Sequence, residues 1–375
     1  EWQGLILEVV QRQVAGVLGH ASADAIDPQR AFKDLGFDSL SALELTNGLR
    51  QTTGLRLPAT LIFDHPSPAA VAEFLRGEAT TSDITPAAPS TTGGTLGALL
   101  RQAHEGHSLV DFGNVLAAAS RFRPSFASST ELDPPPSVVS LARGESTQLI
   151  CIPSFMAGSG PYQFARLADG FGGARTVSAL SLPGFCATEA APATWSAAID
   201  SLAGSVRKLA GNEQFVLVGY SNGVALAHAL ARRLEEHGVF PAGVVMIDTY
   251  APDSQDEIGR VFSAVMATIV DREDAVMSLD DDGLLSMGTY IRLVAQWDPL
   301  PIDAPSLLIR ASDPIADAVE GGRSPWWQHP RDIAEVAGDH FGVIEETAGE
   351  TARVIDAWVR RTIDESRLVH EAHAT

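Results

Sequence analysis

Residues 215–238, FVLVGYSNGVALAHALARRLEEHG, contain the pattern that decides the fold. The apolar run FVLVG is typical of a buried strand, and the residues after it follow a helical pattern. Between the two lies GYSNG (219–223), which matches G-x-S-x-G. A serine on such a tight strand-to-helix turn is forced out of the sheet at the N-terminus of the helix. The segment therefore predicts an α/β fold with Ser221 as a candidate nucleophile.

Short apolar runs on both sides of this segment alternate with helical stretches. The strand candidates are VVSL, LICI, TVSAL, FVLVG, GVVMID, SLLIR and IAEVA, all between residues 138 and 337. Such alternation is typical of a mainly parallel sheet covered by helices on both faces. The interval 252–304 is too long for a simple crossover and has its own amphipathic pattern. We expect it to be an inserted helical lid.

A serine nucleophile needs a base, and the base needs a group that orients it. Among the ten histidines, His340 lies in a loop after the last strand candidate, where this chain order delivers its base. His228 lies seven residues along the helix from Ser221, about 10 Å away, and is expected to pack. Two acids stay open, because Asp248 ends GVVMID and Asp313 follows SLLIR. Periodicity does not choose between them.

The oxyanion donors are expected to be backbone N–H groups beside the nucleophile. One is the N–H of Asn222, and the other should come from the loop PSFMAGSGP (153–161) after LICI. Phe155 is the first choice in that loop, and Met156 is the next. The glycines of the loop do not make a phosphate-binding loop, because no Lys-Ser/Thr follows them.

Length and charge limit the classes of function. The 375 residues are too many for one compact core, so two or three domains are expected. The formal net charge of −21 argues against binding to nucleic acid or to an anionic membrane surface. The chain begins at Glu1 with residues that already look helical, which we interpret as a fragment of something longer.

Cysteine content and hydropathy limit the compartment. Cys151 and Cys186 make neither a disulfide framework nor a CxxC metal pair. We therefore expect no metal site and a reducing, cytoplasmic compartment. The sequence contains no signal peptide and no apolar stretch of about 18 residues, so we expect no membrane-spanning segment.

Changes in composition mark the domain boundaries. Residues 1–76 predict a small helical unit. Residues 77–94 are rich in Thr, Ala, Pro and Gly and predict a flexible linker. Helical periodicity returns over residues 95–123, so the second domain is expected to cover residues 95–366, followed by a tail at 367–375.

The first domain resembles a known family of carriers. FKDLGFDSL (32–40), with LPATLIFDHPSP (57–68) downstream, closely resembles the acyl carrier proteins of modular type I polyketide synthases. Those carriers are four-helix bundles with 4′-phosphopantetheine on the serine of their D-S-L motif, which is Ser39 here. Local chemistry alone would make Ser39 a helix N-cap. The resemblance implies that upstream synthase domains and a phosphopantetheinyl transferase are partners.

Residues 95–361 resemble the terminal thioesterases of these synthases, which are α/β-hydrolases with a helical lid. The matching segments include TLGALLRQAHE, PSFMAGSGPYQFARLA, SLPGF and GDHF. In that family the acid lies in a V-x-x-D-x-Y-x-P context, which VMIDTYAP (245–252) matches. The resemblance therefore favours Asp248 over Asp313. It also implies that leader helices within residues 95–123 pair two chains into a homodimer.

The resemblance implies that the chain releases a finished polyketide from its carrier thioester through an acyl-serine, as a macrolactone or a free acid. Many relatives have His and a small residue around the serine, where this chain has Tyr220 and Asn222. Two other interpretations stay open. One is a nonribosomal-peptide-type thioesterase or a stand-alone esterase, and the other is a non-catalytic carrier and docking module.

Overall fold

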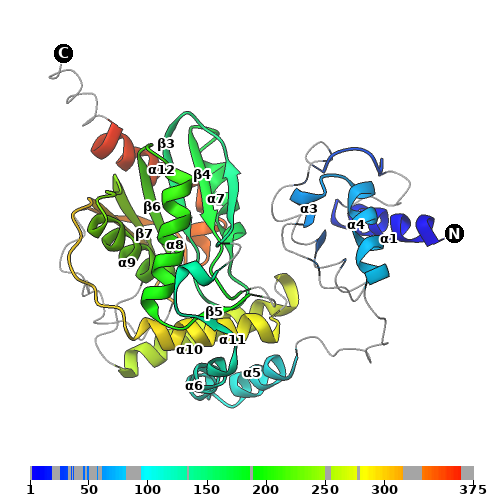
Figure 1. Ribbon diagram of the computed structural model, residues 1–375, viewed down its shortest axis with the longest axis horizontal. Coiled ribbons are helices and arrows are strands. Elements are labelled where there is room, and N and C mark those ends of the chain that lie inside the picture. Colours follow the sequence, from blue (N-terminus) through cyan, green and yellow to red (C-terminus); the bar gives the residue numbers. More distant parts are fainter. Residues whose placement is uncertain are drawn as a thin grey trace. The chain divides into compact units, whose positions relative to one another are not determined.

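The structure is a computed structural model that describes residues 2–18, 26–32, 35, 37, 45, 46, 49, 57, 61–81, 94–132, 135–185, 189–249, 255–276, 279–315 and 332–364. Contacts divide the chain into two compact units, residues 1–91 and residues 92–375. Each unit is described by itself below (Figure 1).

The first unit is helical. Its described helices are α1 (Trp2–Val17), α3 (Leu61–Asp64) and α4 (Pro68–Thr81). They enclose an apolar core that includes Val10, Val14, Leu45, Leu49, Leu61, Val71 and Leu75. The helical prediction is thus correct for the described part, and α4 continues past residue 76. Ser39 and most of the expected helix after it lie outside the described residues.

The second unit is built on a seven-stranded sheet in the order β2-β4-β3-β6-β7-β8-β9. Its strands are β2 (Val138–Ala142), β3 (Ser146–Ile152), β4 (Arg175–Leu180), β6 (Phe215–Tyr220), β7 (Gly243–Ile247), β8 (Ser306–Ala311) and β9 (Asp332–Val336). Only β2 runs antiparallel to its neighbour, so the predicted mainly parallel sheet is confirmed. The predicted apolar runs coincide with these strands, except that Asp248 and Ala337 lie one residue past β7 and β9. The central strands β6 and β7 are buried on both faces and therefore apolar, whereas the outer strands β2 and β9 are partly exposed.

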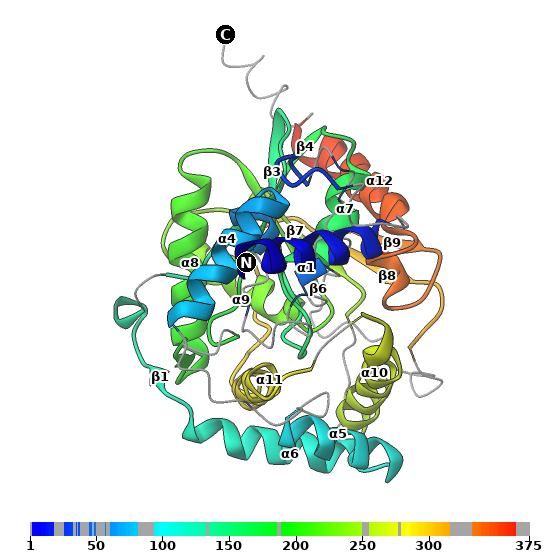
Figure 2. The same ribbon diagram turned by 90° about the vertical axis from the view of Figure 1, so that its right-hand side faces the viewer.

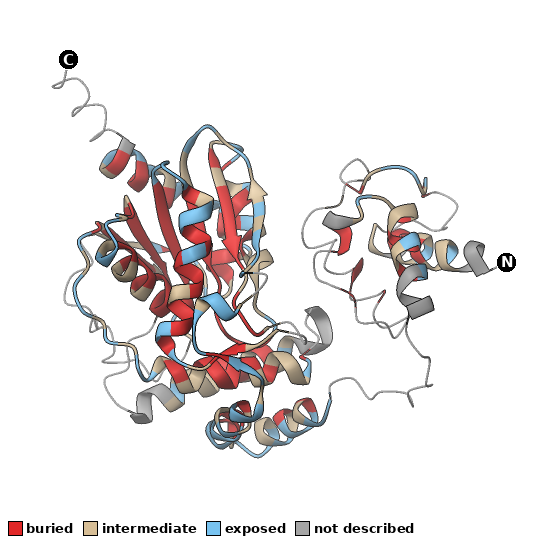
Figure 3. Ribbon diagram, in the orientation of Figure 1, coloured by how far each residue is buried: buried red, intermediate tan, exposed pale blue. Residues whose placement is uncertain are grey.

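Helices cover both faces of this sheet (Figure 1). α7 (Ala165–Gly170) and α12 (Ala348–Val359) pack on one face. α8 (Trp195–Ala210) and α9 (Gly223–Glu236) pack on the other. Figure 3 shows the central strands as buried. This three-layer arrangement, with a lid inserted after β7, is the α/β-hydrolase fold that the sequence predicted.

Several short elements complete the unit. A small parallel pair, β1 (Ser125–Phe126) with β5 (Ala191–Pro192), was not predicted, since two residues are too short to show a period. Single helical turns are at Ser120–Phe122, Ser129–Glu131, Pro161–Phe164, Gly342–Ile344 and Arg360–Asp364. Within the described ranges, none of the helices has the length and apolar character needed to cross a lipid bilayer.

Two leader helices and two lid helices form a separate layer. The leader helices are α5 (Thr95–Glu105) and α6 (Leu109–Ala119), and the lid helices are α10 (Gln255–Val276) and α11 (Asp281–Val294). Figure 2 shows the two pairs side by side. They share one apolar core that includes Leu100, Phe112, Leu116, Met266, Leu284 and Met287. The leader and the lid therefore fold as one layer, although about 140 residues separate them.

The helices α6 and α11 cross at very short distance. A Cβ atom built on Gly288 of α11 would lie 2.4 Å from the carbonyl oxygen of Leu116 in α6. No side chain fits in that space, so the crossing requires glycine at this position.

We therefore expect Gly288→Ala to lower the free energy of unfolding by about 1–3 kcal/mol, because the added methyl group must push the helices apart. Gly204 in α8 is the matched control, since an added Cβ there has nothing within 4 Å. Gly204→Ala should instead stabilise the protein by about 0.5–1 kcal/mol, as expected for a glycine in an open helix. Urea unfolding measures the free energy of unfolding of both variants. Equal changes in the two variants would contradict the close contact of α6 and α11 at Gly288.

Candidate active site

Ser221 lies on the sharp turn between β6 and α9. Its φ of +53° is in the left-handed region, which is unfavourable for any residue other than glycine. The turn is held against β7 by a hydrogen bond from the Ser221 N–H to the Ile247 carbonyl, at 2.9 Å. A Cβ atom on Gly223 would lie 2.3 Å from the carbonyl oxygen of Pro153. The second glycine of GYSNG thus lets α9 begin directly against the loop after β3.

The predicted base and acid lie next to this serine. Nε2 of His340 is 2.9 Å from Oγ of Ser221, and its Nδ1 is 2.7 Å from Oδ2 of Asp248. The three residues are 7%, 1% and 5% exposed, in the order serine, histidine, aspartate. Because a carboxylate faces Nδ1, that nitrogen carries the proton and Nε2 is free to accept the serine proton. The arrangement is a buried nucleophile–base–acid series.

The backbone fixes Asp248 as firmly as it fixes Ser221. Asp248 also has a positive φ, +40°, and its N–H donates to the Ile309 carbonyl at 2.8 Å. Its Oδ1 accepts the N–H of Ala311 at 2.9 Å, which leaves Oδ2 for His340. The other candidate, Asp313, is exposed and accepts the hydroxyl of Ser312. The structure thus brings Asp248 to the histidine and leaves Asp313 outside the series.

The loop that carries His340 is also held by Tyr220. The Tyr220 hydroxyl donates to the backbone carbonyl of His340 at 2.8 Å, and the two rings stack with centroids 5.1 Å apart. Burial, and next the negative charge of Asp248, raise the pKa of Tyr220 well above its ordinary value. The hydroxyl therefore stays protonated and donates. In the sequence, Tyr220 stands out only as a departure from many relatives, although its position directly before Ser221 could have suggested a role.

The loop after β3 is engaged by the side chain of Asn222. Oδ1 of Asn222 accepts the N–H of Phe155 at 2.9 Å and the hydroxyl of Ser154 at 3.0 Å. The N–H of Met156 donates to Oγ of Ser154 at 3.2 Å. Since a backbone N–H can only donate, the atom of Asn222 that faces it is the amide oxygen. Both candidate oxyanion donors of this loop therefore already have an acceptor.

Comparison with known protein families gives this geometry its context. The thioesterase domain family matches residues 147–359, which is more than half of the chain. The chain belongs to the thioesterase family. The phosphopantetheine attachment site matches residues 8–75, so the thioesterase follows a domain of the kind that carries phosphopantetheine on a serine. Ser39 lies within the matched range but outside the described residues.

Relatives align along nearly the whole chain. Erythronolide synthase EryA3 of Saccharopolyspora erythraea is 37% identical over 357 residues, which cover 94% of this chain and 11% of that protein. Polyketide synthase GfsE of Streptomyces halstedii is 38% identical over 384 residues, which cover 96% of this chain and 10% of that protein. The chain thus spans about a tenth of the length of these relatives.

Among solved structures, the Vlm2 thioesterase domain bound with a dodecadepsipeptide is similar at 21% identity and a TM-score of 0.47. The match covers 59% of this chain and 96% of that one.

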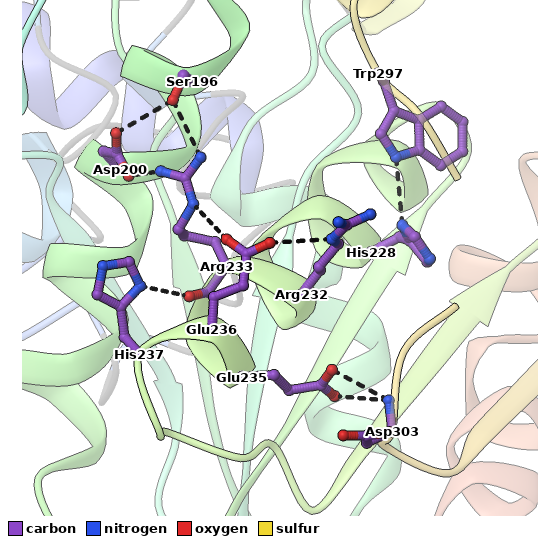
Figure 4. A network of polar contacts seen from close by, with 10 residues as sticks. All are labelled: Ser196, Asp200, His228, Arg232, Arg233, Glu235, Glu236, His237, Trp297 and Asp303. Carbon is purple, nitrogen blue, oxygen red and sulfur yellow. Dashed lines mark hydrogen bonds and ion pairs between the residues drawn. The ribbon is translucent and has the colours of Figure 1, made fainter. Parts of the chain in front are cut away.

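His228 packs inside the thioesterase domain, away from the catalytic series. His228 in α9 is 1% exposed, and its Nδ1 accepts the indole N–H of Trp297 at 3.3 Å (Figure 4). Two turns further along α9, the carboxylate of Glu235 accepts the N–H of Asp303 at 3.1 Å. These contacts hold the segment between the lid and β8 against α9. The prediction that His228 packs is consistent with this geometry, and Ser221 is served by His340.

The buried His228 should make stability depend on pH. Burial lowers its pKa to about 4, from an ordinary value of 6.5. Between pH 6.5 and about pH 4, His228 binds a proton in the unfolded chain but not in the folded chain. The free energy of unfolding therefore decreases as the pH is lowered over this range. We expect this residue alone to remove about 2 kcal/mol between pH 6.5 and pH 5.

Urea unfolding of the thioesterase at several pH values, with His228→Asn as the comparison, measures this effect. Asparagine keeps an acceptor for Trp297 but does not titrate, so the variant should lose less stability over this range, whatever its stability at pH 7. Parallel losses in the two proteins would show that His228 does not titrate as described.

Proposed function

We propose that the chain is the terminal carrier and thioesterase region of a polyketide synthase, which releases the finished acyl chain through an ester on Ser221. The observation that carries the proposal is the buried hydrogen-bonded series of Ser221, His340 and Asp248. It lies in a thioesterase-family chain behind a phosphopantetheine attachment domain. The aligned regions of polyketide synthases support the same assignment.

In the first half-reaction, Nε2 of His340 takes the proton of the Ser221 hydroxyl as the serine oxygen attacks the thioester carbonyl. Asp248 keeps Nδ1 protonated and stabilises the imidazolium that forms. When the tetrahedral intermediate collapses, His340 returns the proton to the departing thiol. The acyl chain is then an ester of Ser221.

Backbone N–H groups stabilise the negative oxygen of the tetrahedral intermediate. We assign this role to Asn222, the N-cap residue directly before α9, and to Phe155. The N–H of Phe155 donates to the Asn222 side chain in the structure, so that side chain must turn away before Phe155 can bind the oxyanion. Asn222 would then act twice, with its N–H as a donor and with its amide oxygen as an acceptor that leaves.

In the second half-reaction, His340 activates the group that resolves the ester. A hydroxyl of the acyl chain itself gives a macrolactone, and water gives a free acid. We expect the leader and lid helices to shape the acyl chamber, and their apolar residues suit a bulky and mostly hydrophobic acyl chain. The proposal includes both the macrolactone and the free acid, because Ser221, His340 and Asp248 can serve either nucleophile.

The carrier domain supplies the substrate. Phosphopantetheine, when bound, provides a terminal thiol that holds an acyl chain as a thioester. We assign its attachment to Ser39, by a phosphopantetheinyl transferase, and expect upstream synthase domains to load it. The helical core of the first unit, with Val14, Leu49 and Val71 fully buried, fits a carrier domain.

Intact-protein mass spectrometry tests this function. After incubation with a phosphopantetheinyl transferase and an acyl-coenzyme A, the wild-type chain should gain the acyl-phosphopantetheine mass and then lose its acyl group. Ser39→Ala should gain no mass. Ser221→Ala should lose its acyl group slower by a factor of about 10³ or more, because the nucleophile is gone.

Two matched variants test the acid in the same assay. Asp248→Asn should slow acyl loss about 10⁴-fold, because the wrong tautomer of His340 would be held. Asp313→Asn should behave as wild type, since its carboxylate does not reach His340. An equal rate of acyl loss in wild type and Ser221→Ala would contradict the proposed mechanism. A wild-type chain that gains no acyl-phosphopantetheine mass would contradict the carrier assignment.

We also propose that the leader helices pair two chains. Although the inner faces of these helices are buried, several of their apolar side chains point outward. The exposed ones are Leu99 at 42%, Val110 at 45%, Val115 at 50% and Phe122 at 91%. Apolar side chains this exposed in one segment are typical of an interface, and a second copy of the chain buries them symmetrically.

Light scattering coupled to size-exclusion chromatography measures the mass of the assembly. We expect a dimer for wild type and a monomer for the double variant Val115→Asp/Phe122→Asp, because two buried charges per chain would have no partner. Phe240, which is 62% exposed outside the leader segment, gives the control Phe240→Asp, which should stay dimeric. A monomeric wild type would refute this interface.

A further inference from the structure

A charged residue of the lid contacts the loop that carries His340 from outside the sheet. Arg272, near the end of the described part of α10, forms an ion pair with the carboxylate of Glu345. Its guanidinium carbon also lies over the ring of Phe341, 4.8 Å from the centroid. An arginine in this position attracts both a carboxylate and the face of an aromatic ring. Arg272 thus contacts the loop at two points.

Both contact points, Phe341 and Glu345, lie within five residues after His340. Phe341 directly follows His340, and the two rings meet edge to face with centroids 5.3 Å apart. The helical turn Gly342–Ile344 follows, and Glu345 closes it by donating its N–H to the Gly342 carbonyl at 3.0 Å. Arg272 therefore contacts the segment that directly follows His340.

The helix that carries Arg272 is anchored to the leader and lid layer. Asp271 in α10 lies 3.2 Å from Nε2 of His104 in α5. Val265, Met266 and Ile269 of the same helix are buried in the apolar core shared with the leader helices, against which Phe341 also packs. Arg272 is the position at which this layer meets the histidine loop through a charged contact.

The sheet holds the same loop from the opposite side. Tyr220 at the end of β6 donates to the carbonyl of His340, as described above. The charges of Glu345 and Arg272 act on Tyr220 in opposite directions, the first raising its pKa and the second lowering it. The ion pair is therefore within electrostatic range of Tyr220, which contacts His340.

We propose that Arg272 is a positioning residue through which the lid helix α10 holds His340 against Ser221. The inference rests on the proposed function, in which His340 is the base. Its consequence is that the serine is activated only while α10 is seated on the histidine loop. A lid displaced from the loop would remove the contacts of Arg272, while those of Tyr220 and Asp248 with His340 remain.

A lid residue could instead act only on the acyl chain, as part of the wall of its chamber. The two roles differ in what they do to a small reagent. A chamber wall changes the KM of a bulky acyl substrate, but leaves the reactivity of Ser221 toward a compact probe unchanged. A positioning residue changes that reactivity, because the probe still needs His340 to take the serine proton.

The experiment measures the second-order rate at which a small alkyl fluorophosphonate labels Ser221 in the full chain. Arg272→Gln removes the charge and should lower the rate by about 10-fold to 100-fold, the range expected for a misplaced catalytic group. Arg272→Lys keeps the charge without the planar guanidinium, so its labelling rate should lie between those of Arg272→Gln and wild type. With a bulky acyl thioester, kcat should fall while KM stays within about twofold.

Two further variants complete the design. Arg260 is an exposed arginine on the same helix, and Arg260→Gln should label as wild type. Glu345→Gln removes the ion pair from the loop side and should slow labelling in the same direction, which tests the proposal if Arg272→Gln does not fold. Labelling of Arg272→Gln at the wild-type rate, or a change in KM alone, would overturn the positioning role. Absence of labelling in wild type would instead overturn the proposed function.

Discussion

The geometry of the site depends on two strained residues at the ends of neighbouring parallel strands. Ser221 directly follows β6 and Asp248 directly follows β7, and both have positive φ angles. Such a conformation costs on the order of 1–3 kcal/mol for a residue other than glycine. The sheet maintains it, because each N–H donates to the next strand, Ser221 to Ile247 and Asp248 to Ile309. The strain turns both side chains out of the sheet at one edge, where His340 can lie between them.

Residues outside the sheet position the other two parts of the site, the base His340 and the oxyanion loop. His340 comes from a loop after β9, so its position depends on contacts beyond the strands. Tyr220 holds that loop from the sheet, and Arg272 contacts it from the lid. On the other side of the serine, Asn222 holds the loop that contains Phe155. The nucleophile is thus set by backbone geometry, while the base and the oxyanion loop are set by single side chains.

Sequence patterns predicted the parts of this architecture that local rules determine. GYSNG between a strand and a helix predicted the turn at Ser221, and chain order after the last strand singled out His340. Asp248 and Asp313 could not be separated by periodicity, because both follow parallel strands whose ends meet at one edge. The family resemblance favoured Asp248, and the structure places that carboxylate on His340.

The contacts that sequence reasoning did not predict join residues far apart in the chain. Tyr220 and His340 are 120 positions apart, and Phe155 and Asn222 are 67 apart. Each depends on a side-chain orientation that only the packed structure selects, and a hydrophobic period carries no information about it. The same reason hid Arg272, whose position on a lid helix looks like an ordinary solvated charge.

The shared core of leader and lid has a consequence for chimeric synthases. The N–H of Leu96, at the start of the leader, donates to Asp281 at the start of α11, at 3.0 Å. The matched thioesterase segment, residues 147–359, leaves the leader out. A chimera joined at residue 147 would lack the native leader helices. Met266, Leu284 and Met287 of the lid would then lose their contacts with the leader. The unit that can be recombined therefore begins before residue 95, at the carrier side of the leader helices.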